Sequence, residues 1–286
     1  MANPSPKSLI LDLLSTLRRG SMPVKALVVA ADIFGIAENA LRVSLARLHG
    51  AQLVERDARG RYRLGPAAKA VDAQVTSWRR TRERFMNWDG SWIAVQRPAN
   101  RAGRKHGDRR GERAMLLVGF RELEPGLHIR PNNLVGGVGR SRDEIEQLGL
   151  AEQAAVFGLC ELDACREARA RSLWDTEALV EGYRATCADL VRSQAALPLL
   201  PTGEAMVESF VIGGRAIRQI VLDPLLPDAL IDASEFAQLI ETTRNYDLAG
   251  RACWASFLGE HGVINGNTPA DLRVGDATAA LPTTGV

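Results

Sequence analysis

The stretch SMPVKALVVAADIFGIAENALRVSLARLHGAQLVERDARGRYRLG, residues 21–65, sets the interpretation of the whole 286-residue chain. Its apolar residues recur at helical spacing and predict one helix over residues 23–35 and another over residues 38–49. Pro23 suits the first helical position, because the N–H it lacks would have no partner there, and Gly35 suits the left-handed residue that ends a helix. One stripe of the second helix faces inward and consists of Leu41, Leu45 and Leu48.

The opposite face of the second helix is slim and polar. At 100° per residue it carries Asn39, Val43 and Ala46, with Arg42 and Arg47 on either side. A helix with little bulk and two guanidinium groups on its outer face fits a DNA major groove, which is roughly 12 Å wide.

Two short strands, residues 53–56 and 61–64, are predicted to form a hairpin after this helix. Gly60 supplies the positive φ of the turn, and apolar and arginine side chains alternate along the second strand. A basic hairpin tip can contact a flanking phosphate or an A·T-rich minor groove. The sequence therefore predicts a winged helix-turn-helix domain at residues 1–65, with DNA contacts from Lys25, Asn39, Arg42, Val43, Arg47, Arg59, Arg61 and Arg63.

The alternative is a small helical packing domain whose arginines are merely solvated. The helix order, the turn glycine, the small outer face and the basic hairpin agree with one another and favour DNA binding. One local rule is broken, since Ala37 stands where Ser or Thr would cap the second helix, and a missing cap costs about 1 kcal/mol.

Charge is distributed unevenly along the chain. Residues 1–114 hold 22 of the 36 Lys and Arg residues and 10 of the 34 Asp and Glu residues, a net +12. The remainder holds 14 basic and 24 acidic residues, a net −10. Contact with a polyanion is therefore expected in the first half.

The rest of the chain predicts further parts of an α+β multidomain protein. Pro66 begins a predicted linker helix, residues 66–87, that runs to about Phe85. Residues 88–168 alternate strands (WDGSWIAVQRP, LEPGLHIRPNNL and AAVFGLCELD) with a helix in SRDEIEQLGL capped by Ser141, which favours a small α/β sandwich. Helical spacing then predicts a helical domain over residues 169–262, followed by a flexible tail over residues 263–286.

Several kinds of chemistry have no sequence signal. No apolar run approaches the ~18 residues of a membrane span, and the N-terminus lacks a signal-peptide pattern, so a cytoplasmic protein with no membrane contact is expected. The four cysteines lack CxxC spacing and neighbouring histidines, which favours free thiols over a zinc site or disulfides. Motifs for nucleotide binding, nucleophilic hydrolysis and zinc peptidases are missing, so neither a cofactor nor an enzyme activity is expected.

Three segments, in order, resemble the PaaX family of bacterial transcriptional repressors. They are GIAENALRVSLARL with the following R-G-R-Y-R-L, then W-D-G-x-W with P-G-L-x-I-R-P-N-N-L, and finally D-P-L-L-P. The resemblance covers roughly residues 6–260. It implies a ferredoxin-like middle domain akin to small CRISPR-associated nucleases. It also implies repression of a catabolic operon for phenylacetate or another aromatic acid, relieved by an acyl-CoA such as phenylacetyl-CoA.

We expect a ligand-responsive repressor that binds a palindromic operator as a homodimer, because one winged helix buries too little surface for nanomolar specificity. The acidic helical region is the expected dimer interface. A metal-dependent nuclease is disfavoured, since Asp89 is the only acid near the first strand of the middle domain and metal chemistry needs clustered carboxylates. An architectural DNA-binding protein without an effector stays open.

Effector contacts are expected in the middle domain. The candidates are the basic, glycine-punctuated stretch before the second strand and two residues of that strand, namely Arg104, Lys105, Arg109, Arg110, Arg113, His128 and Arg130. The basic stretch can equally be a solvated loop or a second DNA contact, and His128 can be a hydrogen-bonded structural histidine.

Overall fold

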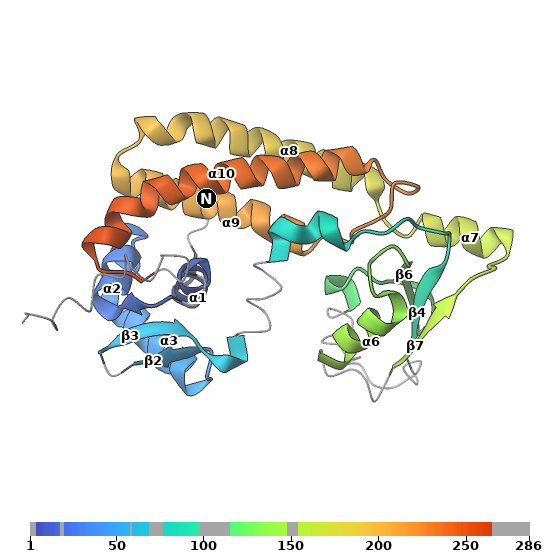
Figure 1. The fold of residues 1–286 in the computed structure, drawn as a ribbon, viewed down its shortest axis with the longest axis horizontal. Helices are drawn as coiled ribbons and strands as arrows, with labels where there is room; N and C mark the ends of the chain where they lie inside the picture. Colours follow the sequence, from blue (N-terminus) through green and yellow to red (C-terminus); the bar gives the residue numbers. More distant parts are fainter. Residues whose placement is uncertain are drawn as a thin grey trace, which may run out of the picture. The chain divides into compact units, whose positions relative to one another are not determined.

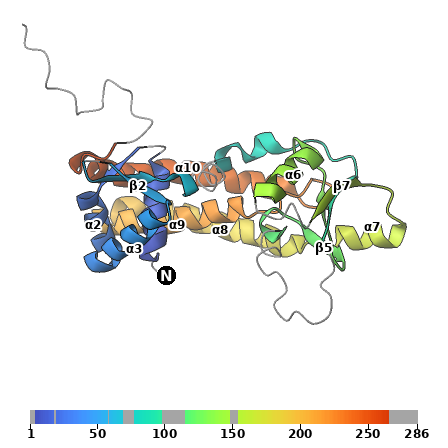
Figure 2. The ribbon, with the colours of Figure 1, turned by 90° about the horizontal axis from the view of Figure 1, so that it is seen from below.

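The computed structural model describes residues 4–17, 20–57, 59–68, 77–97, 115–147 and 154–264. These ranges form a mixed α+β structure with two antiparallel sheets, which confirms the predicted fold class at this level (Figures 1 and 2). The chain divides into two compact units. Unit 1 comprises Met1–Thr76, Leu197–Val211 and Leu248–Val286, and unit 2 comprises Ser77–Ala196 and Ile212–Asp247.

Unit 1 begins with three helices and a small sheet. Its elements are α1 (Pro6–Thr16), β1 (Met22–Pro23), α2 (Val24–Ile33), α3 (Glu38–Gly50), β2 (Val54–Arg56) and β3 (Arg61–Leu64). The three strands are antiparallel in the order β1-β3-β2. The predicted helix, turn, helix and hairpin of residues 21–65 are therefore present, and the sheet gains a short strand before α2 that the sequence did not predict.

Pro23 has a different role from the one predicted. It lies in β1 opposite Arg61 of β3 and forms the N-cap of α2, so the first helical residue is Val24. The other end of α2 is as predicted. Gly35 has φ +67°, and the Ile36 N–H donates to the Ala31 carbonyl at 2.9 Å, the left-handed cap that folds the chain back onto the helix.

The core of unit 1 includes side chains from the far end of the sequence. Phe34, at the end of α2, has its ring centroid 5.2 Å from that of Phe210 and 6.4 Å from that of Trp254. Met206 and Phe257 join the same buried cluster. These residues belong to α9 (Thr202–Val221) and α10 (Ala233–Glu260), and Figure 1 shows the end of α10 beside α2. The side chains of α1, α2 and α3 thus form only part of this core.

The predicted linker helix is not a continuous α-helix in the described residues. A 3₁₀ turn, η1, spans Pro66–Ala68, and a longer 3₁₀ segment, η2, spans Ser77–Arg84. Residues 69–76 lie outside the described part of the chain. In η2 the apolar positions do not continue one α-helical stripe. Trp78 and Thr81 are buried three residues apart, the spacing that a 3₁₀ helix brings to one face.

Unit 2 contains a four-stranded antiparallel sheet. The strands are β4 (Trp92–Gln96), β5 (Arg121–Glu124), β6 (Leu127–Pro131) and β7 (Ala155–Leu159), in the order β5-β6-β4-β7. The segment predicted as one strand at LEPGLHIRPNNL belongs to two strands, because Gly126 with φ +78° turns β5 back into β6. The helix predicted from Ser141 is α6 (Gly137–Gln147), so Ser141 is buried inside the helix and does not cap it.

The W-D-G-S-W segment before β4 is a turn that positions two indole rings. Asp89 Oδ1 accepts hydrogen bonds from the Ser91 N–H at 2.9 Å and the Ser91 hydroxyl at 2.6 Å, and these bonds lower the pKa of the Asp89 carboxyl. Gly90 supplies the positive φ, +87°. As a result Trp88 packs edge-on against buried Trp92, with ring centroids 5.1 Å apart.

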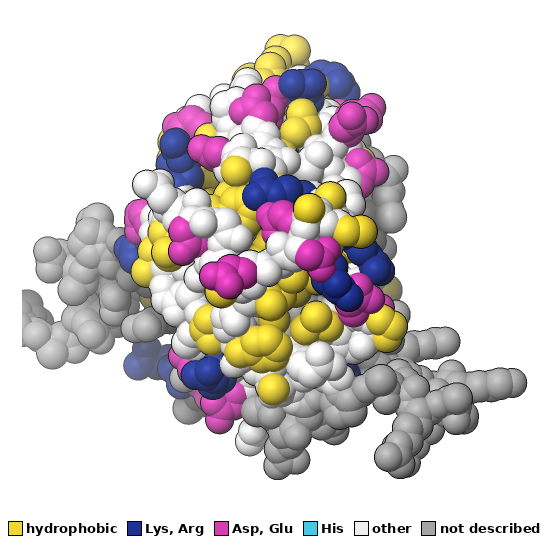
Figure 3. Space-filling model, turned by 90° about the vertical axis from the view of Figure 1, so that its right-hand side faces the viewer, with side chains coloured by type: hydrophobic (Ala, Val, Ile, Leu, Met, Phe, Trp, Pro, Cys, Tyr) yellow, Lys and Arg dark blue, Asp and Glu magenta, His cyan; other side chains and the backbone are white. Residues whose placement is uncertain are grey.

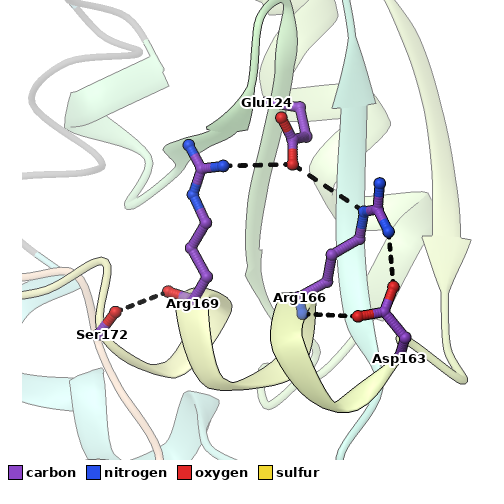
Figure 4. Close-up of polar contacts among 5 residues, drawn as sticks. All are labelled: Glu124, Asp163, Arg166, Arg169 and Ser172. Carbon is purple, nitrogen blue, oxygen red and sulfur yellow. Dashed lines mark hydrogen bonds and ion pairs between the residues drawn. The ribbon is translucent and has the colours of Figure 1, made fainter.

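Helices make up the rest of the described chain. They are α7 (Ala164–Arg171), α8 (Thr176–Ala196), the 3₁₀ turn η4 (Leu197–Leu199), α9 and α10. Figure 4 shows how α7 is fixed: Asp163 caps its N-terminus, and Glu124 of β5 accepts from Arg169 at 3.2 Å and lies 3.9 Å from Arg166. Helices α9 and α10 each contribute residues to both units.

The connector D-P-L-L-P, residues 223–227, is buried in unit 2 between α9 and α10. Asp223 accepts from the Tyr183 hydroxyl at 2.5 Å and from the Leu225 N–H at 2.8 Å. The Leu225 carbonyl in turn accepts from Asn133, just after β6, at 2.9 Å, and the Pro224 carbonyl accepts from Arg130 at 3.4 Å. Two of the three motifs that carry the family resemblance therefore interlock by hydrogen bonds.

Tyr183→Phe tests the connector's anchor. Burial raises the pKa of Asp223 to about 6, so the folded state binds this proton more tightly than the unfolded chain and loses that stabilisation as pH rises from about 4 to 6. Above pH 6 the ionised, buried carboxylate depends on the tyrosine hydroxyl. We expect Tyr183→Phe to lower the free energy of unfolding by about 2 kcal/mol at pH 8 and by less at pH 5, as measured by urea denaturation of the full chain.

Tyr246→Phe is the matched control, because the Tyr246 hydroxyl is buried against the uncharged Ser193 hydroxyl at 2.7 Å. Its effect should be the same at both pH values. A pH-independent loss in Tyr183→Phe would contradict the assigned role of Asp223.

Candidate nucleic-acid interface

Helix α3 separates an apolar face from a polar one. Leu41, Leu45 and Leu48 are buried in the core of unit 1, as predicted. The opposite face is exposed along its length and includes all the outward residues predicted from the sequence, namely Asn39, Arg42, Val43, Ala46 and Arg47. Ala37 precedes the helix as its N-cap without a side-chain hydrogen bond, so the first-turn N–H groups are not satisfied by a cap.

The two arginines of this face differ in their contacts. Arg42 forms an exposed pair with Glu38 one turn earlier, with 2.6 Å between Nη2 and Oε1. For Arg47, exposed in the last turn, no ion pair is found within the described residues. An exposed i,i+4 pair contributes only about 0.3–0.5 kcal/mol, so Arg42 can exchange its carboxylate for a phosphate or a base edge at little cost.

The hairpin tip is ordered by one carboxylate. Asp57 Oδ1 accepts from the backbone N–H groups of Arg59 at 3.0 Å and Arg61 at 2.8 Å, while Gly60 takes φ +75°. This fixes the turn with the side chain of Arg59 exposed. Of the hairpin's predicted DNA contacts, Arg59 is thus the residue at the tip.

Arg61 does not fit its predicted role as a DNA contact. Its guanidinium donates to the Ser21 hydroxyl, the Ser21 carbonyl and the Gly262 carbonyl, each at 2.8 Å. Partial burial lowers the pKa of this guanidinium. The side chain therefore joins β3 to the residue just before β1 and to the turn just after α10.

The remaining predicted contacts are Arg63 and Lys25, and both are exposed. Arg63 lies opposite Glu55 across the β2–β3 pair, and its Nη2 is 2.8 Å from Glu55 Oε2. Lys25 is exposed in the first turn of α2. Together with Arg42, Arg47 and Arg59, these residues give unit 1 a set of exposed cations on α2, α3 and the hairpin.

The surface of unit 2 has a different charge pattern. On the face shown in Figure 3, basic and acidic side chains lie next to one another. On α7, for example, Arg166 and Arg171 pair with Asp163 and Glu167 at 2.6 and 2.7 Å. Alternating charge of this kind does not attract a polyanion strongly, so unit 1 is the better candidate for a nucleic-acid interface.

The predicted effector residues fall into two groups. Arg104, Lys105, Arg109, Arg110 and Arg113 lie outside the described residues. His128 and Arg130 of β6 are buried, with relative exposures of 9% and 3%. Arg130 donates to the Val118 carbonyl at 2.6 Å, and its burial lowers its pKa to about 10, so it stays charged at neutral pH.

Metal and thiol chemistry find little support in the described residues. Within them, no three His, Cys, Asp or Glu side chains gather closely enough to hold a metal ion. Cys160, Cys165, Cys187 and Cys253 are unpaired thiols. None of the helices in the described ranges has the length and apolar character of a membrane span.

The comparisons with known proteins concern the fold. No protein-family model matches the chain, and no curated protein does. Among solved structures, the chain is similar to the uncharacterized protein Rv0674 from Mycobacterium tuberculosis, with 23% sequence identity and a TM-score of 0.59. The similarity covers 88% of this chain and 98% of that one, so it extends over both units.

Arg59 and Arg61 of the hairpin provide a test of their different roles. We expect Arg61→Ala to lower the free energy of unfolding by about 1–3 kcal/mol, because it removes charged hydrogen bonds to two carbonyls and a hydroxyl. Arg59→Ala, two residues away, should leave stability unchanged. Urea denaturation of both variants measures the difference, and equal stability in the two would show that the Arg61 contacts do not hold unit 1 together.

Proposed function

We propose that this protein is a DNA-binding transcriptional repressor that reads duplex DNA with α3 and the β2–β3 hairpin. The observation that carries the proposal is the exposed outer face of α3, where Asn39, Arg42, Val43 and Arg47 are held away from the core by Leu41, Leu45 and Leu48 on the other side. The element order α1-β1-α2-α3-β2-β3 supports the interpretation of this part as a winged helix-turn-helix.

The dimensions of α3 suit a major groove. Its 13 residues make a helix of about 20 Å, long enough to cross a groove roughly 12 Å wide. Asn39 can pair with an adenine edge, and an arginine can pair bidentately with guanine. The hairpin tip, with Arg59, then reaches a neighbouring phosphate or the minor groove.

We further propose that two copies bind a palindromic operator. One winged helix buries too little surface for nanomolar affinity, whereas two linked copies double the contacts and fix the half-site spacing. The acidic helical region, which contains the long helices α8, α9 and α10, is the proposed dimerisation region.

The middle segment is proposed to be a ferredoxin-like domain. Its sheet order β5-β6-β4-β7, with α6 between β6 and β7, is the order of a β-α-β-β-α-β unit. By resemblance to the PaaX family, the operator is proposed to belong to a catabolic operon for an aromatic acid, and an aryl acyl-CoA is proposed to release the protein from DNA.

Two other functions have less support. A metal-dependent nuclease needs clustered carboxylates, and Asp89 uses its carboxylate to order the turn before β4. An architectural DNA-binding protein would use the same exposed cations without base readout, and DNase footprinting separates it from a repressor. A short palindromic footprint supports repression, and diffuse coverage supports the architectural role.

Arg47→Ala tests α3 as the reading helix. The preferred duplex is first selected from a random library with the wild-type chain, and binding is then measured by fluorescence anisotropy. Loss of a base-reading or phosphate-binding arginine costs about 1–3 kcal/mol, a loss of affinity of about five- to 150-fold. If Arg47 contacts phosphate, the salt dependence also becomes shallower.

Arg166→Ala is the matched control. It removes the same charge from α7 in unit 2, where the arginine is exposed and paired with Asp163 at 2.6 Å. It should bind the selected duplex like the wild type. Wild-type affinity in Arg47→Ala, or an equal loss in both variants, would rule out α3 as the reader.

A further inference from the structure

A group of arginines in unit 2 lies where η2, β6 and α6 meet, and it plays no part in the proposed DNA interface. Arg84 is fixed there by its backbone: the Val135 N–H donates to the Arg84 carbonyl at 2.8 Å, and the Met86 N–H donates to the Asn133 carbonyl at 2.8 Å. These two bonds hold the end of η2 against the segment that leads from β6 into α6.

Glycines at the start of α6 make room for a second arginine. Gly136 has φ +95°, and a Cβ atom added there would lie 2.9 Å from the Arg140 Cβ. Only a residue without a side chain leaves Arg140 in its place. Arg140 is thereby held one turn before Glu144 on α6, with 2.8 Å between its Nε and Glu144 Oε1.

Two guanidinium groups share the carboxylate of Glu144, since Arg84 Nη2 lies 3.8 Å from the oxygen that Arg140 contacts. Arg130 of β6 forms no ion pair with Glu144, but it lies close enough for the charges of Glu144, Arg84 and Arg140 to act on its guanidinium. Arg84 and Arg140 together carry more positive charge than one carboxylate neutralises, and Arg130 adds a further charge. The group therefore has an excess of two positive charges.

The buried member of the group has no anionic partner in the described chain. Arg130 is 3% exposed and donates to two neutral carbonyls, those of Val118 and Pro224. Its Nε is buried without an acceptor, and so is the Nε of Arg84. A buried guanidinium with unsatisfied N–H groups is unfavourable unless a negative group completes its hydrogen bonds.

We propose that Arg84, Arg130 and Arg140 form a binding site for the phosphate or carboxylate group of a small molecule, which displaces Glu144 as the anion paired with Arg84 and Arg140. Guanidinium groups bind both kinds of anion bidentately, which a lysine cluster does not do. The side chains of Arg84 and Arg140 are 24% and 32% exposed, so an anion can reach them from solvent. Arg130 adds a buried positive charge to the group.

The proposal does not rest on DNA binding, and its test needs no DNA, although Arg130 is also one of the residues predicted to contact an effector. Isothermal titration calorimetry of the full chain uses pyrophosphate and inorganic phosphate as one class of probe and benzoate and acetate as the other, at constant ionic strength. Binding of the phosphate probes alone indicates a phosphate-bearing ligand, and binding of the carboxylate probes alone indicates an organic acid. Binding of neither class would overturn the proposal.

Two variants locate the site. Arg140→Gln should weaken the bound probe about tenfold or more, since it removes a charged hydrogen bond. Arg142→Gln is the matched control, because Arg142 lies on the same helix, is exposed, and donates to the Val156 carbonyl at 3.1 Å. Equal losses in the two variants would show a diffuse charge effect and would overturn the site.

Glu144→Gln separates binding from a structural role. If Glu144 competes with the ligand, removing its charge should tighten probe binding several-fold even though the Arg140 ion pair is lost. If the group is only an internal salt bridge, Glu144→Gln will give no gain in affinity, and the proposal fails. This variant decides the question even if Arg140→Gln loses stability.

Discussion

The position of α3, the proposed reading helix of unit 1, depends on aromatic side chains that lie far from it in sequence. Phe34 stands at the end of α2, next to the glycine that turns the chain toward α3, and it packs between Phe210 and Trp254. Aromatic pairs of this kind contribute about 0.5–1.5 kcal/mol each beyond the apolar area that they bury. Because the turn follows Phe34 directly, the ends of α9 and α10 help to fix the orientation of α3.

A comparable interlock organises unit 2, but it is built from polar groups. Asn133 and Arg130 donate to carbonyls of the D-P-L-L-P connector, and Asp223 at its start accepts from Tyr183. Leu225 adopts φ +54°, which a leucine takes only where its surroundings enforce it. The hydrogen bonds of the connector thus join the sheet of unit 2 to its helices. Through them the P-G-L-x-I-R-P-N-N-L and D-P-L-L-P motifs belong to one unit.

Local signals in the sequence predicted the parts of the fold that depend on local physics. The leucine stripe of α3 and the left-handed Gly35 are where helical periodicity and glycine's freedom require them. The predictions for Pro23 and Ser141 were wrong because they rested on neighbouring residues alone. Pro23 pairs with Arg61, 38 positions away and invisible to a helix-start rule. Ser141 was predicted to cap a helix, but α6 already begins at Gly137, a glycine with a positive φ.

The candidate sites were harder to predict from the sequence than the fold, because tertiary contacts decide whether an arginine side chain can bind a ligand. Arg59 and Arg61 are equivalent in the hairpin pattern, yet one is exposed and the other is bound to Ser21 and Gly262. No pattern in the sequence joins Arg84 to Arg140, since backbone pairing across 50 residues brings them to one carboxylate. Charge counts identify the basic half of the chain. The number of hydrogen-bond acceptors around each guanidinium then decides which arginines hold the protein together and which can bind an anion from outside.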